Sequence, residues 1–231
     1  MPDETAPTNT TTAPTESGSP ASALRALGCG CWGLVVLFVG AVLVLIVLFA
    51  SASSGSANLP RVAPEDMASR AFQRSQEAYG VLGFERSVKP GVEKVGVSTE
   101  NTFSSGFCYD GGLLGLDDKT VDGAYRMSHS WALDRVPASR AVPGIRRLHR
   151  HLEDDGWEVT SYREGGKGKD WELFVQRDGG DERMSFTWFP DREYFMGDAT
   201  VPCAYDPAWK DGDIGPAGDR QVPPRLRALR A

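Results

Sequence analysis

The feature that most constrains this chain is an apolar run at residues 29–50, within a longer stretch that carries no charge between Arg25 and Arg61. A helix of this run rises about 1.5 Å per residue and would be about 33 Å long, close to the ~30 Å hydrocarbon core of a bilayer. Most of its side chains are Leu, Val, Ile or Phe, which favour membrane insertion. The sequence therefore predicts one transmembrane helix at 26–50, with residues 29–50 in contact with lipid.

Two other motifs overlap this run. Gly28, Gly30 and Gly33 have the spacing G-x-G-x-x-G, but a dinucleotide site also needs a preceding strand, a following amphipathic helix and a later acidic residue, and the sequence provides none of them. We therefore expect no cofactor. Cys29 and Cys31 are too few for a zinc site. We interpret them as small residues at the mouth of the span, with lipidation of a juxtamembrane cysteine as the alternative.

A cleaved signal peptide is the main rival to a permanent anchor. Residues 50–52 read Ala-Ser-Ala, the small-x-small form that a signal peptidase recognises. The apolar run is longer than the usual core of about 7–15 residues in a signal peptide, and the leader before it contains a single basic residue. Retention of the segment is therefore the favoured interpretation.

Composition divides the rest of the chain. Residues 1–25 are rich in Thr and Pro and have too few large apolar side chains to fold, so they predict a disordered tail. Residues 51–63 form a Ser/Gly/Ala linker, and residues 64–205 are long enough for one domain with its own core. Residues 206–231 are rich in Pro and Gly and predict a flexible tail.

Hydrophobic periodicity predicts an α+β fold for the domain. Helices are expected from Pro64 to about Gly80 and over 139–155, where the start lies at Ser139 or near Pro143. Alternating or turn-bounded apolar segments predict strands at 101–109, 125–133, 157–162, 170–177 and 183–189. The expected architecture is an antiparallel sheet of about five strands with helices on one face, preceded by the disordered tail and the transmembrane helix.

Cys108 and Cys203 are the only cysteines beyond the apolar run, and they bracket most of the predicted domain. This placement predicts a structural disulfide, which forms in an oxidising compartment. The distribution of arginines around the span weakly favours the opposite orientation, but long domains translocate with little regard to charge. We therefore expect a cell-membrane protein with a cytoplasmic N-terminus and an extracytoplasmic domain.

The sequence lacks the common catalytic motifs, among them G-x-S-x-G, H-E-x-x-H and a phosphate-binding loop. Of its three histidines, His129 falls on the apolar side of a predicted strand. A buried, hydrogen-bonded histidine is the favoured interpretation there. The alternative function is an envelope-associated hydrolase that uses a cleft around His129 and nearby carboxylates. No catalytic, cofactor-binding or metal-binding residue is assigned.

The second predicted helix carries a basic face of Arg146, Arg147, His149 and Arg150. Because the net charge of the whole chain is −6, we expect no nucleic-acid binding. This face is either a solvated surface or a contact with a protein or an anionic component of the envelope.

The Thr/Pro-rich tail, the "GCGCWG" entry to one span and the small arginine-rich domain together resemble single-pass membrane proteins of actinobacteria that have no assigned function. The resemblance is one of layout, so it implies no site residues. With the features above, it indicates a membrane-anchored, extracytoplasmic protein that acts as a non-catalytic binding or interaction module.

Overall fold

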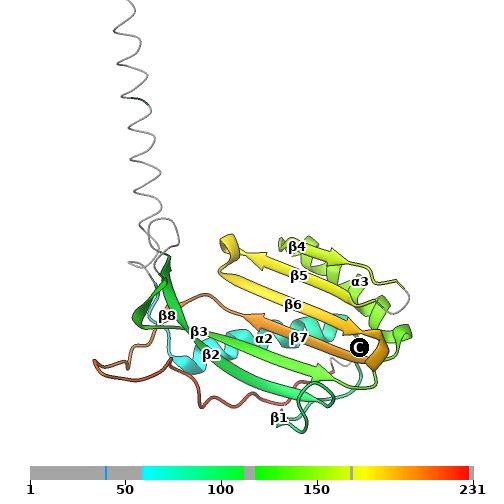
Figure 1. Ribbon diagram of the computed structural model, residues 1–231, viewed down its shortest axis with the longest axis horizontal. Helices are drawn as coiled ribbons and strands as arrows, with labels where there is room; N and C mark the ends of the chain where they lie inside the picture. Colours follow the sequence, from blue (N-terminus) through cyan, green and yellow to red (C-terminus); the bar gives the residue numbers. More distant parts are fainter. Residues whose placement is uncertain (1–39, 41–58, 112–117, 167–168, 229–231) are drawn as a thin grey trace, which may run out of the picture. The chain divides into compact units, whose positions relative to one another are not determined.

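The computed structural model describes residue 40 and residues 59–111, 118–166 and 169–228 (Figure 1). The predicted tail, all of the predicted span except residue 40, and most of the linker 51–63 therefore lie outside the described residues. Within the described part of the chain, no helix is both long and apolar enough to cross a membrane.

One antiparallel sheet of eight strands dominates the structure. Seven strands lie in the order β1-β2-β3-β7-β6-β5-β4, and β8 pairs with β3 beyond the end of β7. The strands are β1 (Gly91–Val92), β2 (Glu100–Gly111), β3 (Asp118–Leu133), β4 (Glu158–Arg163), β5 (Trp171–Arg177), β6 (Glu182–Phe189), β7 (Tyr194–Thr200) and β8 (Ala204–Tyr205).

The predicted α+β fold, with about five strands after a transmembrane helix, is wrong. Residues 59–228, where described, form mostly one large sheet with two α-helices, and the five expected segments form β2 to β6. Three strands were missed: β1 and β8 have two residues each, too short for a periodic pattern. The third, β7, was hidden because Gly197 and Asp198 interrupt its apolar residues.

Two helices pack on one face of the sheet: α2 (Pro64–Leu82) and α3 (Ala138–Asp154). Both lie behind the sheet in the view of Figure 1. Pro64 opens α2, as predicted, but the helix continues past Gly80 and ends at Gly83, whose φ of 72° suits a residue without a side chain. Helix α3 begins before Ser139 and includes Pro143.

The main core lies between these helices and the sheet. It joins Leu82 of α2 and Leu148 of α3 to the aromatic side chains that line the helix-covered face. The alternation predicted for 125–133 is confirmed as far as residue 131, because Tyr125, Met127, His129 and Trp131 are buried and the residues between them are half-buried. At the end of the strand Ala132 is buried as well as Leu133.

Neither α2 nor α3 covers the central strands on the opposite face, and small polar side chains gather there. On β3 and β7 these include Ser128, Ser130, Asp198 and Thr200, all of them half-buried. The sheet therefore has an apolar face that builds the core and a polar face turned away from it.

Leu226, which lies within the predicted flexible tail, is fully buried in the main core. Its backbone forms two hydrogen bonds with Val88 in the segment that follows α2. Part of the chain beyond residue 206 is thus packed against the helix-covered side of the domain.

Candidate functional site

The disulfide predicted between Cys108 and Cys203 is confirmed. The two Cα atoms are 6.1 Å apart, and the bond joins β2 to the segment between β7 and β8 across 95 positions of sequence. Cys108 is buried, so this bond is a structural link within the domain.

His129 is fully buried on β3, between the ring edges of Phe72 and Phe103. Its Nε2 lies 2.7 Å from Oδ1 of Asn101, and the Nδ2 of that amide donates to the carbonyl oxygens of Val88 and Pro224. Because the amide nitrogen is committed to those carbonyls, Oδ1 accepts and the histidine carries its proton on Nε2. Burial lowers the pKa of His129 to about 3.

This environment is that of a neutral core histidine. Among the described residues, Nδ1 of His129 has no hydrogen-bond partner, and the described cavities are lined by other residues. Within the described part of the chain, His129 is fully buried and does not line any of these three cavities.

The four residues of the predicted basic face have different roles. Arg146 forms a two-point ion pair with Glu164 and lies over the ring of Trp171. His149 stacks on Tyr162, with ring centroids 4.0 Å apart. These two side chains are therefore engaged within the domain.

Arg147 donates to the carbonyl oxygens of Val81 and Leu82, the last two residues of α2. These groups lack partners within the helix, so Arg147 caps its C-terminal end and joins α3 to α2. Arg150 is exposed, and no hydrogen bond or ion pair of its side chain is found within the described ranges. The structure thus does not gather the predicted face into one free cationic patch.

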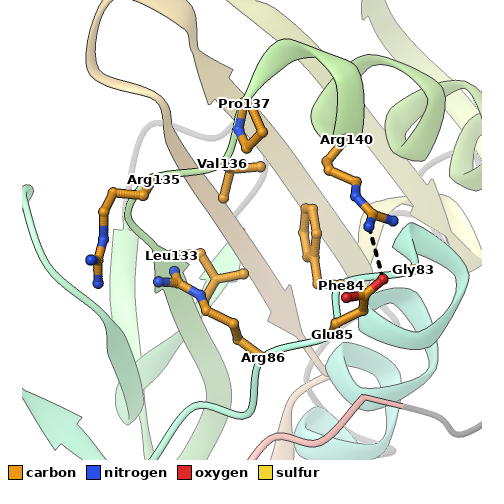
Figure 2. A pocket seen from close by; sticks show the side chains of 9 residues that line it. All are labelled: Gly83, Phe84, Glu85, Arg86, Leu133, Arg135, Val136, Pro137 and Arg140. Carbon is orange, nitrogen blue, oxygen red and sulfur yellow. Dashed lines mark ion pairs between the residues drawn. The ribbon is translucent and has the colours of Figure 1, made fainter.

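A different group of arginines surrounds a cavity of about 150 Å³ at the end of the sheet where α2 ends and α3 begins (Figure 2). Its apolar lining consists of Phe84, Leu133, Val136 and Pro137. Figure 2 shows these side chains between Arg86 and Arg135 on one side and the Arg140–Glu85 ion pair on the other. We call this the arginine-rimmed cavity.

Local geometry fixes the floor of the cavity. Val136 donates its N–H to the carbonyl oxygen of Glu193 at 2.7 Å, and its own carbonyl oxygen accepts the indole N–H of Trp188 at 2.9 Å. The ring of Phe84 packs edge-on against Tyr79 and Phe195. The apolar lining is therefore preorganised by the core beneath it.

Asp134 organises one side of the rim. Its carboxylate accepts from Arg86 Nη2 and from Arg135 Nε, each at 2.9 Å. Desolvation alone would raise the pKa of Asp134, but the hydrogen bonds and charges of the two arginines outweigh it and lower this pKa. The carboxylate is therefore ionised at neutral pH and orients both guanidinium groups.

Arg147 is the one member of the predicted basic face that reaches the edge of this cavity. A Cβ atom placed at Gly83, which lines the cavity, would lie 2.8 Å from Arg147 Nη2. The site thus combines an apolar floor, three arginines in its lining and a fourth beside it, against the carboxylates of Asp134 and Glu85. Such a site suits a ligand with an anionic group and a small apolar part.

Sequence reasoning missed this cavity. Its lining comes from residues 83–86, 133, 135–137 and 140, and no local pattern links these segments. The only local signal is the dense use of arginine around β3 and α3. Among the described residues, no cluster of three or more His, Cys, Asp or Glu side chains could hold a metal ion.

Comparisons with known proteins add little. No family model matches the sequence, and no curated protein matches it. The structure is similar to that of a DUF4853 family protein from Actinomyces odontolyticus, with a TM-score of 0.35 and 13% sequence identity over 68% of this chain and 77% of that chain. At this level of similarity, neither fold nor function is transferred to this protein.

Proposed function

We propose that this protein is a non-catalytic binding module of the bacterial envelope that holds the anionic group of a ligand in the arginine-rimmed cavity. The supporting observation is the position of Arg86, Arg135 and Arg140 around an apolar floor. Guanidinium groups bind carboxylates and phosphates through paired hydrogen bonds.

Two of these arginines are exposed, and in the described part of the chain a single ion pair holds each of them. The side chains of Arg135 and Arg140 are 80% and 59% exposed, and exposed ion pairs such as theirs contribute little to stability. Replacing the ion pair with Asp134 or Glu85 by an ion pair with a ligand anion therefore costs little free energy. Arg86 is more firmly held, because it also donates to the backbone carbonyl oxygen of Asp134.

Hexanoate and hexanol are suitable probes, because they share an apolar chain and differ in charge. Full-length protein in nanodiscs of zwitterionic lipid would be titrated with each by calorimetry, with empty nanodiscs as the blank. We expect hexanoate to bind more tightly than hexanol. The double variant Arg135→Gln/Arg140→Gln should weaken hexanoate binding about tenfold or more and leave hexanol unchanged.

Arg150→Gln is the matched control, because Arg150 is also an exposed arginine of α3 but does not line the cavity. Equal affinity for both probes, or the same loss in the control, would show that the cavity does not select anions.

A hydrolase centred on His129 is the weaker proposal. The catalytic base would be the buried imidazole of His129, whose pKa is about 3. The Nε2 of this imidazole is already hydrogen-bonded to the side-chain amide of Asn101. Activity that survives replacement of His129 by Gln, or the absence of any activity, would remove it.

We further propose that the domain is extracytoplasmic. The Cys108–Cys203 disulfide supports this location, because such bonds persist in oxidising compartments. Thiol labelling of denatured cells before reduction should leave both residues unmodified. Attachment to the membrane through residues 29–50, and the likeness in layout to actinobacterial single-pass proteins, rest on the sequence alone. Release of the mature protein with a mass starting near Ser53 would instead indicate a cleaved signal peptide.

A further inference from the structure

The uncovered face of the sheet contains a second hollow, separate from the arginine-rimmed cavity. Its volume is about 230 Å³, and side chains of β4, β5, β6 and β7 line it. The lining includes Phe174, Gln176, Arg183, Ser185 and Asp198. We call it the open-face groove. The groove forms because some of its lining side chains, such as Ser185 and Thr200, are small, whereas others, such as Phe174 and Arg183, are large.

Asp198 lies half-buried in this groove within an ordered chain of hydroxyl groups. Its Oδ2 accepts from Ser130 Oγ at 2.7 Å, and its Oδ1 accepts from Thr200 Oγ1 at 3.1 Å. Because Thr200 gives its one hydroxyl proton to Asp198, it accepts in turn from Ser128 Oγ at 2.7 Å. These contacts fix the carboxylate in one orientation.

No described basic side chain forms an ion pair with Asp198. Desolvation raises its pKa despite the two hydroxyl donors, and the charge of Glu100 adds to this effect. Among the described residues, each carboxylate oxygen accepts one hydrogen bond and keeps a further lone pair. The groove therefore presents a carboxyl group that two hydroxyls hold in place and that forms no ion pair with a described side chain.

Donors and an apolar ring surround this acceptor. Arg183 is held at the groove by a hydrogen bond from its Nε to the carbonyl oxygen of Gly180. The hydroxyl of Ser185 can donate or accept. The ring of Phe174 is 38% exposed, which is unusual for a phenylalanine. Side chains that donate, side chains that accept and an exposed ring thus share one surface.

Hydroxyl groups are the ligand chemistry that satisfies such a mixed set, because each hydroxyl both donates and accepts. A simple cation would use the carboxylate and be repelled by Arg183, and a simple anion would be repelled by Asp198. The C–H face of a sugar ring also packs on an aromatic side chain. We infer that the open-face groove binds a neutral glycan chain, with Asp198 accepting from sugar hydroxyls and Phe174 packing on a ring.

The test uses full-length protein in zwitterionic nanodiscs and three neutral probes: tetra-N-acetylchitotetraose, cellotetraose and mannotetraose. At least one should bind. Phe174→Ala and Asp198→Ala should each reduce that affinity about tenfold or more. Phe107→Ala is the matched control, because Phe107 is 39% exposed on β2, outside the groove, and should leave the affinity unchanged. Circular dichroism and thermal unfolding would establish that each variant is folded.

The Arg135→Gln/Arg140→Gln variant should bind the same sugar as the parent protein, so this test is independent of the arginine-rimmed cavity. Failure of all three probes at millimolar concentration would overturn the inference. So would an affinity that Phe174→Ala and Asp198→Ala leave unchanged. Binding of a lysine oligomer in place of the sugars would assign the groove to a cationic partner instead.

Discussion

The indole of Trp131 on β3 lies directly against the backbone of Gly197 on β7. A Cβ atom placed at Gly197 would lie 2.3 Å from both Cε2 and Cζ2 of this ring. The two residues are directly paired across the strands, and the indole also stacks on Phe195 two residues earlier in β7. The absence of a side chain at Gly197 thus lets the indole of Trp131, the largest of the fully buried side chains, lie against the sheet.

Gly197→Ala should therefore destabilise the domain strongly. The methyl group would push the indole out of its position between β7 and α2, and overpacking of this kind costs about 1–3 kcal/mol or more. Urea unfolding would measure the loss. Gly106→Ala is the control, because its Cβ would lie 3.6 Å from the nearest neighbour. Equal effects of the two variants would contradict this account of the packing.

His129→Gln should make the domain less sensitive to acid. With a folded pKa of about 3, the imidazole stays neutral while the unfolded chain takes up a proton below about pH 6.5, so stability falls as the pH falls. The slope is about 1.4 kcal/mol per pH unit between these limits. Gln keeps an amide N–H for Asn101 and does not titrate.

The measurement is the free energy of unfolding from pH 7 to pH 4 for the parent protein and the variant. His151→Gln, at a partly exposed histidine of α3, is the control and should keep the acid sensitivity of the parent. Identical pH profiles for the parent protein and His129→Gln would show that His129 is not buried in its neutral form.

Asp198→Asn should stabilise the domain at neutral pH. Since desolvation raises the folded pKa of Asp198, the folded state favours the protonated carboxyl. The stabilisation from this group is fully present below its unfolded pKa and is lost as the pH rises through the folded pKa. The amide does not titrate, so the variant does not lose this stabilisation at high pH. The free energies of unfolding of the parent protein and the variant should differ at pH 7 and converge near pH 4. A difference that does not change with pH would contradict this.

Replacement of both Cys108 and Cys203 by Ser should lower the free energy of unfolding by a few kcal/mol. A closed loop of about 100 residues gives an upper value of about 4.7 kcal/mol in the chain-entropy treatment. Reduction of the parent protein should have the same effect. The Cys29→Ser/Cys31→Ser variant serves as the control, and we expect its domain to unfold like that of the parent.

Arg147→Gln should destabilise the domain, whereas Arg150→Gln should not. Arg147 donates to two carbonyl oxygens at the end of α2. Because the residue is exposed, solvent screens these contacts, and we expect the variant to lose about 1 kcal/mol of unfolding free energy. Thermal unfolding of the two variants gives the comparison. A role of Arg147 limited to binding an external anion would leave the stability unchanged.

The success and failure of sequence reasoning on this chain follow from the range of the interactions involved. The strand at 125–133 and the start of α2 have local signals: alternation in the first, and proline followed by acidic residues in the second. Gly197 has no such signal, because the need for glycine there comes from Trp131, 66 positions away along the chain. Gly197 is thus required by the packing of the core, and it also interrupts the apolar pattern by which β7 could have been predicted.

The candidate sites were less predictable than the disulfide. Cys108 and Cys203 were the only cysteines in the domain, so composition alone paired them. The arginine-rimmed cavity depends on the loop after α2 meeting the loop before α3, where Arg135 adopts a φ of 53°. Asp198 reads as a turn residue in the sequence and becomes a groove residue only through its neighbours on β3 and β6.

The burial of Leu226 also sets an order of events in the synthesis of the protein. Its backbone pairs with Val88, and the carbonyl oxygen of Pro224 accepts from Asn101, which in turn holds His129. Until these late residues have been made and have emerged, the core has a gap beside α2, and one of the two amide hydrogen bonds of Asn101 is unmade. The core beside α2 is therefore complete only after the segment around residue 226 has been synthesised.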